Sequence, residues 1–417
     1  MWDPYAEFQT ATLPNGLAVH AAHWPDRPWE AMGFLIHSGA EQDPVGLEGL
    51  THFVEHLVSE NLSVSKNDMR KIFKDWGGAV RLGTTGYHFT HYRLFVPAEK
   101  DKLERALSMF GEMLLLAGLR KFIERERRVI IGEFHLSYPV KFAYDLEIQK
   151  QKAVYKDTWL ERFVSPLGNP ESIESMTQTD LQMQYDMHYT PANMSVVGVG
   201  GIELDQLVSL LANSPFGINK QGTRTPLPTP MSVVEPLTEN RYIFEFSHHV
   251  SMATPLRVGQ YLSIAKLPGT IKPGLVELVE AMLDEKLMEE VRERRAWTYH
   301  IETDSYDFRY LWEFSIRCRG LEPKALDKIE NVVEIALASM NEDLFEQAKH
   351  RALASSRMID PTGNKICKGA LNDLANNYRI ISLAEYDTEI ERITMSDIRE
   401  VLKLLRPAQR YTVITKP

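Results

Sequence analysis

Hydrophobic and polar residues follow the same succession of periods in both halves of the chain. Residues 50–57 have apolar positions at helical spacing, and residues 275–282 repeat that rhythm in the second half. Strand-like alternation follows in each half, over residues 87–96 and 311–318. Helical patterns then complete both halves, over residues 100–116 and 122–136 in the first and 322–340 and 345–358 in the second. The two halves therefore resemble diverged copies of one unit.

A segment without sustained periodicity lies between the halves. Residues 213–237 are rich in Pro, Gly, Thr and Asn, which is typical of a linker. We therefore expect an N-terminal domain over residues 1–212 and a homologous C-terminal domain over residues 238–417. Because strands and helical hairpins are mixed in each copy, the pattern predicts an α+β fold. It consists of two homologous α/β-sandwich domains from an internal duplication.

Charge and composition limit the function. Hydrophobic residues make up 44% of the chain and charged residues 25%, as in globular proteins. The net charge of -10 argues against nucleic-acid binding, which needs clustered Lys and Arg. It fits a soluble enzyme and slightly favours basic substrates, although a diffuse acidic surface is the commoner cause of such a charge.

Several classes of protein are not indicated by the sequence. Cys318 and Cys367 are too few for a disulfide framework, and there is neither a Gly-x-Ser-x-Gly elbow nor a P-loop. The N-terminus has no basic segment followed by an apolar run, and no stretch reaches the roughly 18 apolar residues of a membrane span. We therefore expect a cytoplasmic protein without membrane contact.

One helical segment carries the side chains of a metal site. Successive helical residues rotate by about 100°, so His52, Glu55 and His56 share one face. Two such imidazoles can hold a zinc ion, and a catalytic zinc keeps one position open for water. Glu55 would act as general base on the zinc-bound water and return the proton to the leaving amine. This is the inverted His-x-x-Glu-His motif of a metallopeptidase, although two structural histidines and a solvated Glu would give the same pattern.

A two-histidine site needs a third protein ligand. Residues 122–136 offer several acids, of which Glu126 and Glu133 lie two helical turns apart on one face. The neighbouring Glu and Arg residues could equally form a solvated charged surface. Spacing alone does not choose among these acids.

These motifs resemble the pitrilysin or insulinase-type zinc metallopeptidase family, and in particular its mitochondrial-processing-peptidase-like subgroup. The resemblance rests on residues 38–41, 49–57, 166–170 and 189–198. It implies one Zn2+ per chain, with His52, His56 and Glu133 as ligands; 76 residues, 57 to 132, separate His56 from Glu133. It also implies that Glu126 orients a ligand by hydrogen bonding.

The resemblance continues in the second half. Residues 291–299 are similar to the family's Arg-and-Tyr element. This similarity implies that Arg292 binds the substrate backbone and that Tyr299 helps to stabilise the oxyanion of the tetrahedral intermediate. Without the metal motif upstream, Arg292 would be interpreted as a surface charge and Tyr299 as a packed strand residue.

The family also has a strand that lines the substrate. Arg81, Leu82, Gly83 and Thr84 occupy the corresponding stretch here. The resemblance implies that a peptide substrate pairs its backbone with the edge of this strand. Arg81 stands where the family often has Asn, so the peptide contacts and the cleavage preference are expected to differ.

The resemblance also implies an assembly. Full-length members enclose a chamber between two bowl-shaped halves, and this chain would form one half of that clamshell. We therefore expect a zinc endopeptidase or oligopeptidase that hydrolyses short or unfolded peptides in a closed chamber. A second copy of the chain would complete it as a homodimer, with a heterodimer with a related chain as the other possibility. The alternative is a non-catalytic peptide-binding or structural subunit of a heteromeric processing peptidase.

Overall fold

The computed structural model describes residues 2–60, 64–139, 141–218, 222–235, 241–245, 259–358 and 362–416. The chain forms two compact units. The first unit comprises residues 1–148, 159–226 and 360–383, and the second comprises residues 149–158, 227–359 and 384–417. Among the described residues, no helix combines the length and the apolar character that a membrane crossing requires.

The first unit is built on a six-stranded sheet with the order β1-β2-β6-β3-β5-β4. The strands are β1 (Phe8–Thr12), β2 (Ala18–His23), β3 (Trp29–Ile36), β4 (Ala79–Arg81), β5 (Thr90–Pro97) and β6 (Met194–Gly200). The longer helices are α1 (Leu50–Glu60), α2 (Lys66–Asp75), α3 (Lys100–Leu115), α4 (Ile123–Ser137), α7 (Gln178–His188), α8 (Leu204–Ala212) and α14 (Gly363–Asn377). Short helices are η1 (Ala40–Gln42), η2 (Trp159–Arg162), α6 (Pro170–Ser175), η3 (Pro191–Asn193) and α9 (Pro215–Ile218), and α5 (Lys141–Val154) runs from the first unit into the second.

The second unit is built on a five-stranded sheet with the order β7-β11-β8-β10-β9. The strands are β7 (Arg241–Glu245), β8 (Gly259–Pro268), β9 (His300–Asp307), β10 (Leu311–Leu321) and β11 (Arg410–Lys416). The helices are α10 (Pro273–Leu287), the π-helical η4 (Met288–Glu293), α11 (Pro323–Leu326), α12 (Ile329–Ala338), α13 (Glu342–Arg357), α15 (Leu383–Arg392), α16 (Met395–Leu404) and η5 (Pro407–Gln409). Apolar residues of α10, α12, α13 and α16 pack with β8 and β10 into one core.

The two sheets repeat one topology. The order β2-β6-β3-β5-β4 matches β7-β11-β8-β10-β9, with one parallel pair followed by antiparallel pairs in each sheet. Helix α1 follows β3 just as α10 follows β8, and α7 and α16 both begin with a Thr-x-x-Asp capping box. The predicted α+β fold with two homologous domains is confirmed.

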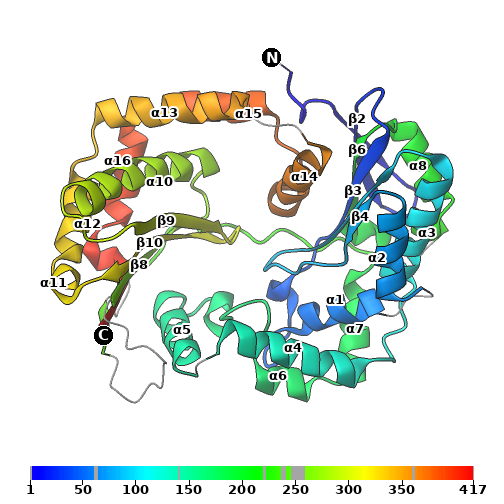
Figure 1. Ribbon diagram of the computed structural model, residues 1–417, viewed down its shortest axis with the longest axis horizontal. Helices are drawn as coiled ribbons and strands as arrows, with labels where there is room; N and C mark the ends of the chain where they lie inside the picture. The colour runs from blue at the N-terminus through cyan, green and yellow to red at the C-terminus, as the bar shows by residue number, and fades with distance from the viewer. Residues whose placement is uncertain are drawn as a thin grey trace. The chain divides into compact units, whose positions relative to one another are not determined.

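Helix α14 covers a face of the first sheet although it lies in the second half of the sequence. In Figure 1 it stands on one side of this sheet, and α3 stands on the other. Its buried Ile366, Ala370 and Leu371 pack against apolar residues of β2, β3 and β6. At Gly33 of β3 the approach is so close that an added Cβ would lie 2.5 Å from Leu371 Cδ1.

The compact units differ from the predicted domain boundaries in two places. Residues 360–383 belong to the first unit and residues 149–158 to the second. The main crossing, at residues 226–227, lies inside the predicted linker, of which residues 219–221 and 236–237 are outside the described residues. Hydrophobic periodicity shows that a helix has a buried face, but it does not show which sheet that face covers.

The packing of α14 gives a stability prediction. Leu371→Ala should lower the free energy of unfolding of the first unit by about 3 kcal/mol, because it leaves a cavity against β3. Leu371→Met, which nearly keeps the volume, should cost less than about 1.5 kcal/mol. Urea unfolding followed by tryptophan fluorescence measures both. An alanine variant as stable as the wild type would show that α14 does not support this sheet.

Candidate metal centre

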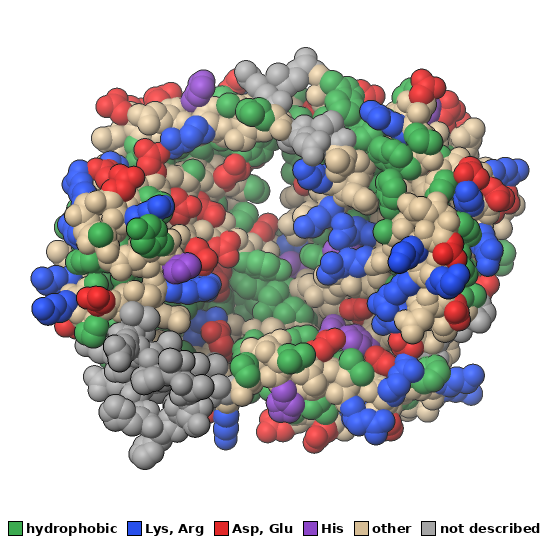
Figure 2. All heavy atoms as spheres, viewed as in Figure 1, with side chains coloured by type: hydrophobic (Ala, Val, Ile, Leu, Met, Phe, Trp, Pro, Cys, Tyr) green, Lys and Arg blue, Asp and Glu red, His purple; other side chains and the backbone are tan. Residues whose placement is uncertain are grey.

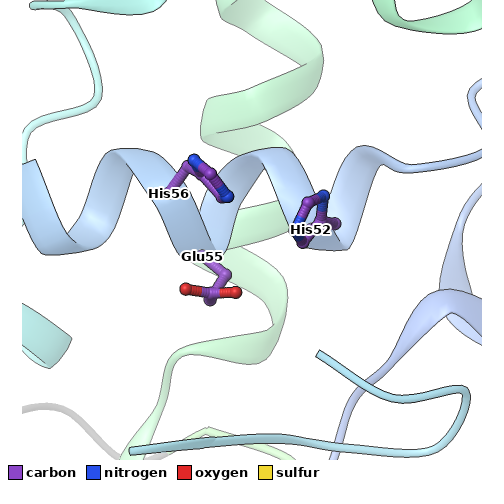
Figure 3. A group of neighbouring side chains, drawn as sticks. All are labelled: His52, Glu55 and His56. Carbon is purple, nitrogen blue, oxygen red and sulfur yellow. The ribbon is translucent and has the colours of Figure 1, made fainter. Parts of the chain in front are cut away.

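Helix α1 is buried on its apolar side and also on its polar side. Phe53 and Leu57 have no exposed surface in the core of the first unit. On the other side, His52 and Glu55 are each only 8% exposed. Figure 3 shows His52, Glu55 and His56 projecting from this one helix, and one ligand atom of each lies within 4.8 Å of the others. The helix therefore presents three potential metal ligands in a largely buried place.

A buried carboxylate holds the N-terminus of α1. Asp43 accepts hydrogen bonds from the backbone N–H groups of Gly49 and Thr51, both at 2.8 Å, and from the Thr51 hydroxyl at 2.6 Å. Arg162 donates to the Asp43 carbonyl oxygen at 2.6 Å. Burial raises the pKa of Asp43 to about 7, although the hydrogen bonds from Thr51 and Gly49 and the charge of Arg162 act in the opposite direction. Sequence reasoning missed Asp43, because it lies well before the usual N-cap position.

Glu133 of α4 approaches both histidines. Its Oε2 atom lies 3.8 Å from His52 Nε2 and 3.6 Å from His56 Nε2. These distances exceed those of hydrogen bonds. They suit three donors around one ion, because Zn–N and Zn–O bonds of about 2 Å place tetrahedral donors roughly 3.4 Å apart. Two imidazole nitrogens and a carboxylate oxygen also form a donor set found at catalytic zinc sites. The residues present therefore fit a zinc ion.

Glu126, also on α4, contacts the opposite nitrogen of His56. His56 Nδ1 donates to Glu126 Oε2 at 3.1 Å, and Arg125 Nε donates to Glu126 Oε1 at 2.8 Å. This bond leaves His56 Nε2 facing Glu133, which is the arrangement that orients a metal-binding imidazole. Glu126 and Glu133 thus contact different nitrogens of His56, a difference that their spacing in the sequence could not reveal. Their roles as orienting residue and ligand stay predictions.

The surroundings of the two histidines shift their pKa values in opposite directions. Burial, assisted by the neighbouring His56, lowers the pKa of His52 to about 3. Burial also acts to lower the pKa of His56, but the hydrogen bond to Glu126 and the carboxylates of Glu55 and Glu133 outweigh it and raise the pKa. In the metal-free protein His52 is therefore neutral at pH 7. The neutral imidazole is the form that binds metals.

Glu55 lies beside these donors and is tethered to the strand region that follows β4. Thr85 Oγ1 donates to Glu55 Oε2 at 3.3 Å. The backbone of Gly83 passes so close that an added Cβ would lie 1.8 Å from Glu55 Oε1, and its φ of +140° also favours glycine. Burial raises the pKa of Glu55 to about 7. Thr85 was not identified from the sequence, although it directly follows the predicted stretch 81–84.

A cleft of about 510 Å3 opens over these side chains, and we refer to it as the metal cleft. It is lined by His52, Glu55, His56, Lys66, Arg70, Val80, Arg81, Leu82, Gly83, Thr84, Thr85, Glu133, Pro166 and Leu167. The four residues predicted to contact substrate, 81–84, all belong to this lining. Among the described strands, β4 is the last of its sheet and pairs with β5. Its outer edge is therefore the place where an extended chain could add to the sheet.

Arg292 and Tyr299 lie in the second unit, whereas the residues of the metal centre lie in the first. Arg292 is part of η4, and its guanidinium carbon lies 4.7 Å from the centre of the Tyr299 ring. Tyr299 is 77% exposed, so it is not the packed strand residue that would be expected if it had no functional role. The structure brings these two residues together, and their catalytic roles stay predictions.

The equivalent helix of the second unit carries no histidine. Glu277 and Glu280 of α10 accept hydrogen bonds from Tyr386 at 2.7 Å and from Ser305 at 2.8 Å. Ala281 occupies the position that corresponds to His56. This helix therefore repeats the architecture of α1 without its imidazole ligands.

Two family models match the chain. Residues 19–136 match the model described as insulinase (peptidase family M16), and residues 175–352 match the one described as peptidase M16 inactive domain. The chain belongs to the insulinase family, peptidase family M16. The first M16 match contains the metal centre, and the second contains α10, the helix without histidines.

Curated relatives support the same family. The β subunit of mitochondrial-processing peptidase from Saccharomyces cerevisiae is 27% identical over 227 residues, which are 53% of this chain and 47% of that protein. An uncharacterised zinc protease from Mycobacterium leprae is 24% identical over 355 residues, which are 83% of this chain and 76% of that protein. The matches span about half the length of several M16 relatives.

Solved structures of M16 proteins share the fold. A protease from Helicobacter pylori has a TM-score of 0.82 at 18% identity, with both chains covered over 100% of their length. The periplasmic protease PqqL from Escherichia coli has a TM-score of 0.77 at 18% identity, with 98% of this chain and 47% of that chain covered. At 18% identity, this structural similarity shows a shared fold and nothing about activity.

The contact between Glu126 and His56 gives a prediction on metal affinity. Glu126→Gln should weaken zinc binding about 10- to 100-fold. The Glu126 carboxylate orients His56 and makes its imidazole more basic, and a neutral amide would do neither as well. Competition with a chromogenic chelator measures the affinity. Glu124→Gln is the matched control, since Glu124 lies on the same helix with its side chain 76% exposed. If both variants bind zinc like the wild type, Glu126 does not support the metal centre.

Proposed function

We propose that this M16 protein is a zinc-dependent endopeptidase or oligopeptidase with one Zn2+ per chain. The supporting observation is the convergence of His52 Nε2, His56 Nε2 and Glu133 Oε2 in an open cleft. These three side chains would hold the ion, and Glu126 would keep His56 in its orientation. When bound, zinc supplies a Lewis acid that polarises the scissile carbonyl and makes a water molecule more acidic.

Glu55 is the proposed general base. Its carboxylate lies next to the converging donors but is held by Thr85 and covered by Gly83. This position leaves it available for proton transfer, whereas Glu133 faces both imidazoles. Glu55 would accept a proton from the attacking water and deliver it to the leaving amine, and such positioned acid–base groups accelerate reactions about 100- to 10,000-fold.

The substrate is proposed to be a short or unfolded peptide. An extended chain can hydrogen bond to the free edge of β4 and thereby pass residues 81–84 and the carboxylate of Glu55. Folded proteins seldom offer a free extended segment for such pairing, so the proposed mode of binding selects peptides or unfolded chains. A closed chamber, as the family resemblance implies, would strengthen this selection by size.

We further propose that a second subunit completes the enzyme. PqqL is covered over only 47% of its length by this chain, so this chain corresponds to about half of that protein. A second copy is the proposed source of the other half, with a related chain as the alternative. Arg292 would bind the substrate backbone and Tyr299 would stabilise the oxyanion, and both would serve the metal centre of the opposite subunit.

Substitution of the proposed base tests the mechanism. Glu55→Gln should retain zinc and lose at least about a hundredfold in kcat, because the base is removed while the ligands remain. Zinc is measured by elemental analysis and cleavage with quenched-fluorescence peptides. Glu124→Gln should keep both zinc and turnover. A wild type without zinc, or a Glu55→Gln variant with normal turnover, would contradict the proposal. A wild type that binds peptides and zinc without turnover would favour a non-catalytic peptide-binding subunit.

Mixing of variants tests the shared site. Glu55→Gln and Arg292→Ala proteins should each be inactive, and their mixture should regain activity after subunit exchange. The mixed dimer then holds one metal centre with an intact base and an intact Arg292 from the opposite subunit. Statistical exchange should restore about one quarter of wild-type activity. If native mass spectrometry shows mixed dimers that remain inactive, the site is not shared in this way.

A further inference from the structure

The metal cleft has a basic wall within an acidic protein. Lys66 and Arg70 come from α2, and Arg81 comes from β4. Figure 2 shows Lys and Arg side chains gathered over these two elements. The cleft also contains two carboxylates, those of Glu55 and Glu133. The three cations outnumber these two carboxylates, of which Glu133 would bind the metal, so the charge that faces a substrate is positive although the whole chain has a net charge of -10.

Two of these cations have no carboxylate partner among the described residues. Lys66 lies 3.5 Å from Glu60, which also pairs with Arg125. In contrast, Arg70 forms no ion pair within the described ranges, and Arg81 donates to the Thr84 hydroxyl at 2.8 Å. Both arginine side chains belong to exposed residues in the lining of the metal cleft. Their guanidinium groups are therefore available to an anionic ligand.

A second observation on β5 points to the same kind of ligand. Arg81 stands directly opposite Arg93 in the β4–β5 register, and like charges in this position destabilise a strand pair. The Nε atom of Arg93 is buried and has no hydrogen-bond partner in the described part of the chain. Burial lowers the pKa of the nearby His91 to about 4, and Arg93, Arg81 and Lys368 act in the same direction. Positive charge is thus concentrated at this sheet edge, and Arg81 and Arg93 form no ion pair with an acid of the described ranges.

We infer that the metal cleft selects peptides with an acidic side chain close to the scissile bond. The carboxylate would bind Arg70 and Arg81, whose planar guanidinium groups suit carboxylate oxygens, while Lys66 adds charge nearby. Such a contact would also relieve the repulsion between Arg81 and Arg93. This inference rests on the proposed peptidase function and adds the chemical class of the substrate. Sequence composition alone favours the opposite class, basic peptides.

Cleavage of matched peptides tests this selectivity. Three peptides share one sequence except for a single residue beside the scissile bond, which is Glu, Gln or Lys, and a second series varies the other side of that bond. For at least one series, kcat/KM of the wild type should fall in the order Glu, Gln, Lys. Arg70→Gln and Arg81→Gln should each reduce the ratio of Glu to Gln peptide about fivefold to tenfold. Added salt should reduce the ratio in the wild type.

Lys71→Gln is the matched control. It removes one positive charge from the same helix as Arg70, but Lys71 is outside the cleft lining, has a side chain 72% exposed and pairs with Asp75 at 2.6 Å. The Lys71→Gln variant should cleave the Glu and Gln peptides with the same ratio of kcat/KM values as the wild type. Arg81→Lys keeps the charge without the guanidinium fork and should retain most of the ratio. Loss of the ratio in Lys71→Gln, or its complete loss in Arg81→Lys, would overturn the assigned roles of these arginines.

Binding to the Glu55→Gln variant separates selectivity from catalysis. Fluorescence anisotropy with labelled Glu and Lys peptides should show tighter binding of the Glu peptide. Equal affinities, or equal cleavage of all peptides by the wild type, would overturn the inference and leave the peptidase function intact. Tighter binding of the Glu peptide by a wild type without any turnover would contradict the peptidase function and support the basic subsite for acidic side chains.

Discussion

The candidate metal centre depends on burying the polar side of α1 while neighbouring residues pair most of its polar groups; His52 Nδ1 is buried and has no hydrogen-bond partner among the described residues. A buried polar group without a partner costs about 1–3 kcal/mol, so the partners of the other groups matter for stability. Asp43 and Gln184 satisfy Thr51 at the start of the helix, and residues of α4 and of the stretch after β4 satisfy His56 and Glu55. These partners come from segments far apart in the sequence. The same contacts that make the burial tolerable therefore also fix the directions of the side chains before any ligand arrives.

The sequence was most informative where a side-chain pattern is local. The helical face of His52, Glu55 and His56 and the order of helices and strands follow from periodicity, and both appear in the structure. Glu126 and Glu133 could be placed on one face of one helix, but their different partners depend on how α4 lies against α1. Asp43 was not visible, because its role depends on a turn that brings it back to the helix N-terminus. Long-range packing decides these features, and periodicity does not encode it.

Net charge and local charge lead to different expectations about substrates. The chain total of -10 counts every acid of the sequence, whereas the field of a solvated charge is screened over about 10 Å. A substrate in the cleft instead responds to the nearest groups, in a hollow where low-dielectric walls concentrate their field. Within this lining three cations outnumber two carboxylates, so the local charge is opposite in sign to that of the whole chain.

The placement of α14 has a consequence for the order of events during synthesis. One face of the first sheet, with Trp24, Leu35 and Val199, is covered by a helix that ends at Asn377. The residues up to Asn377 must therefore leave the ribosome before that face is buried. Until then, a sheet with an exposed apolar surface and a free edge at β4 faces the solvent, a state that invites aggregation. The nascent chain consequently needs either rapid completion or a chaperone that shields this surface.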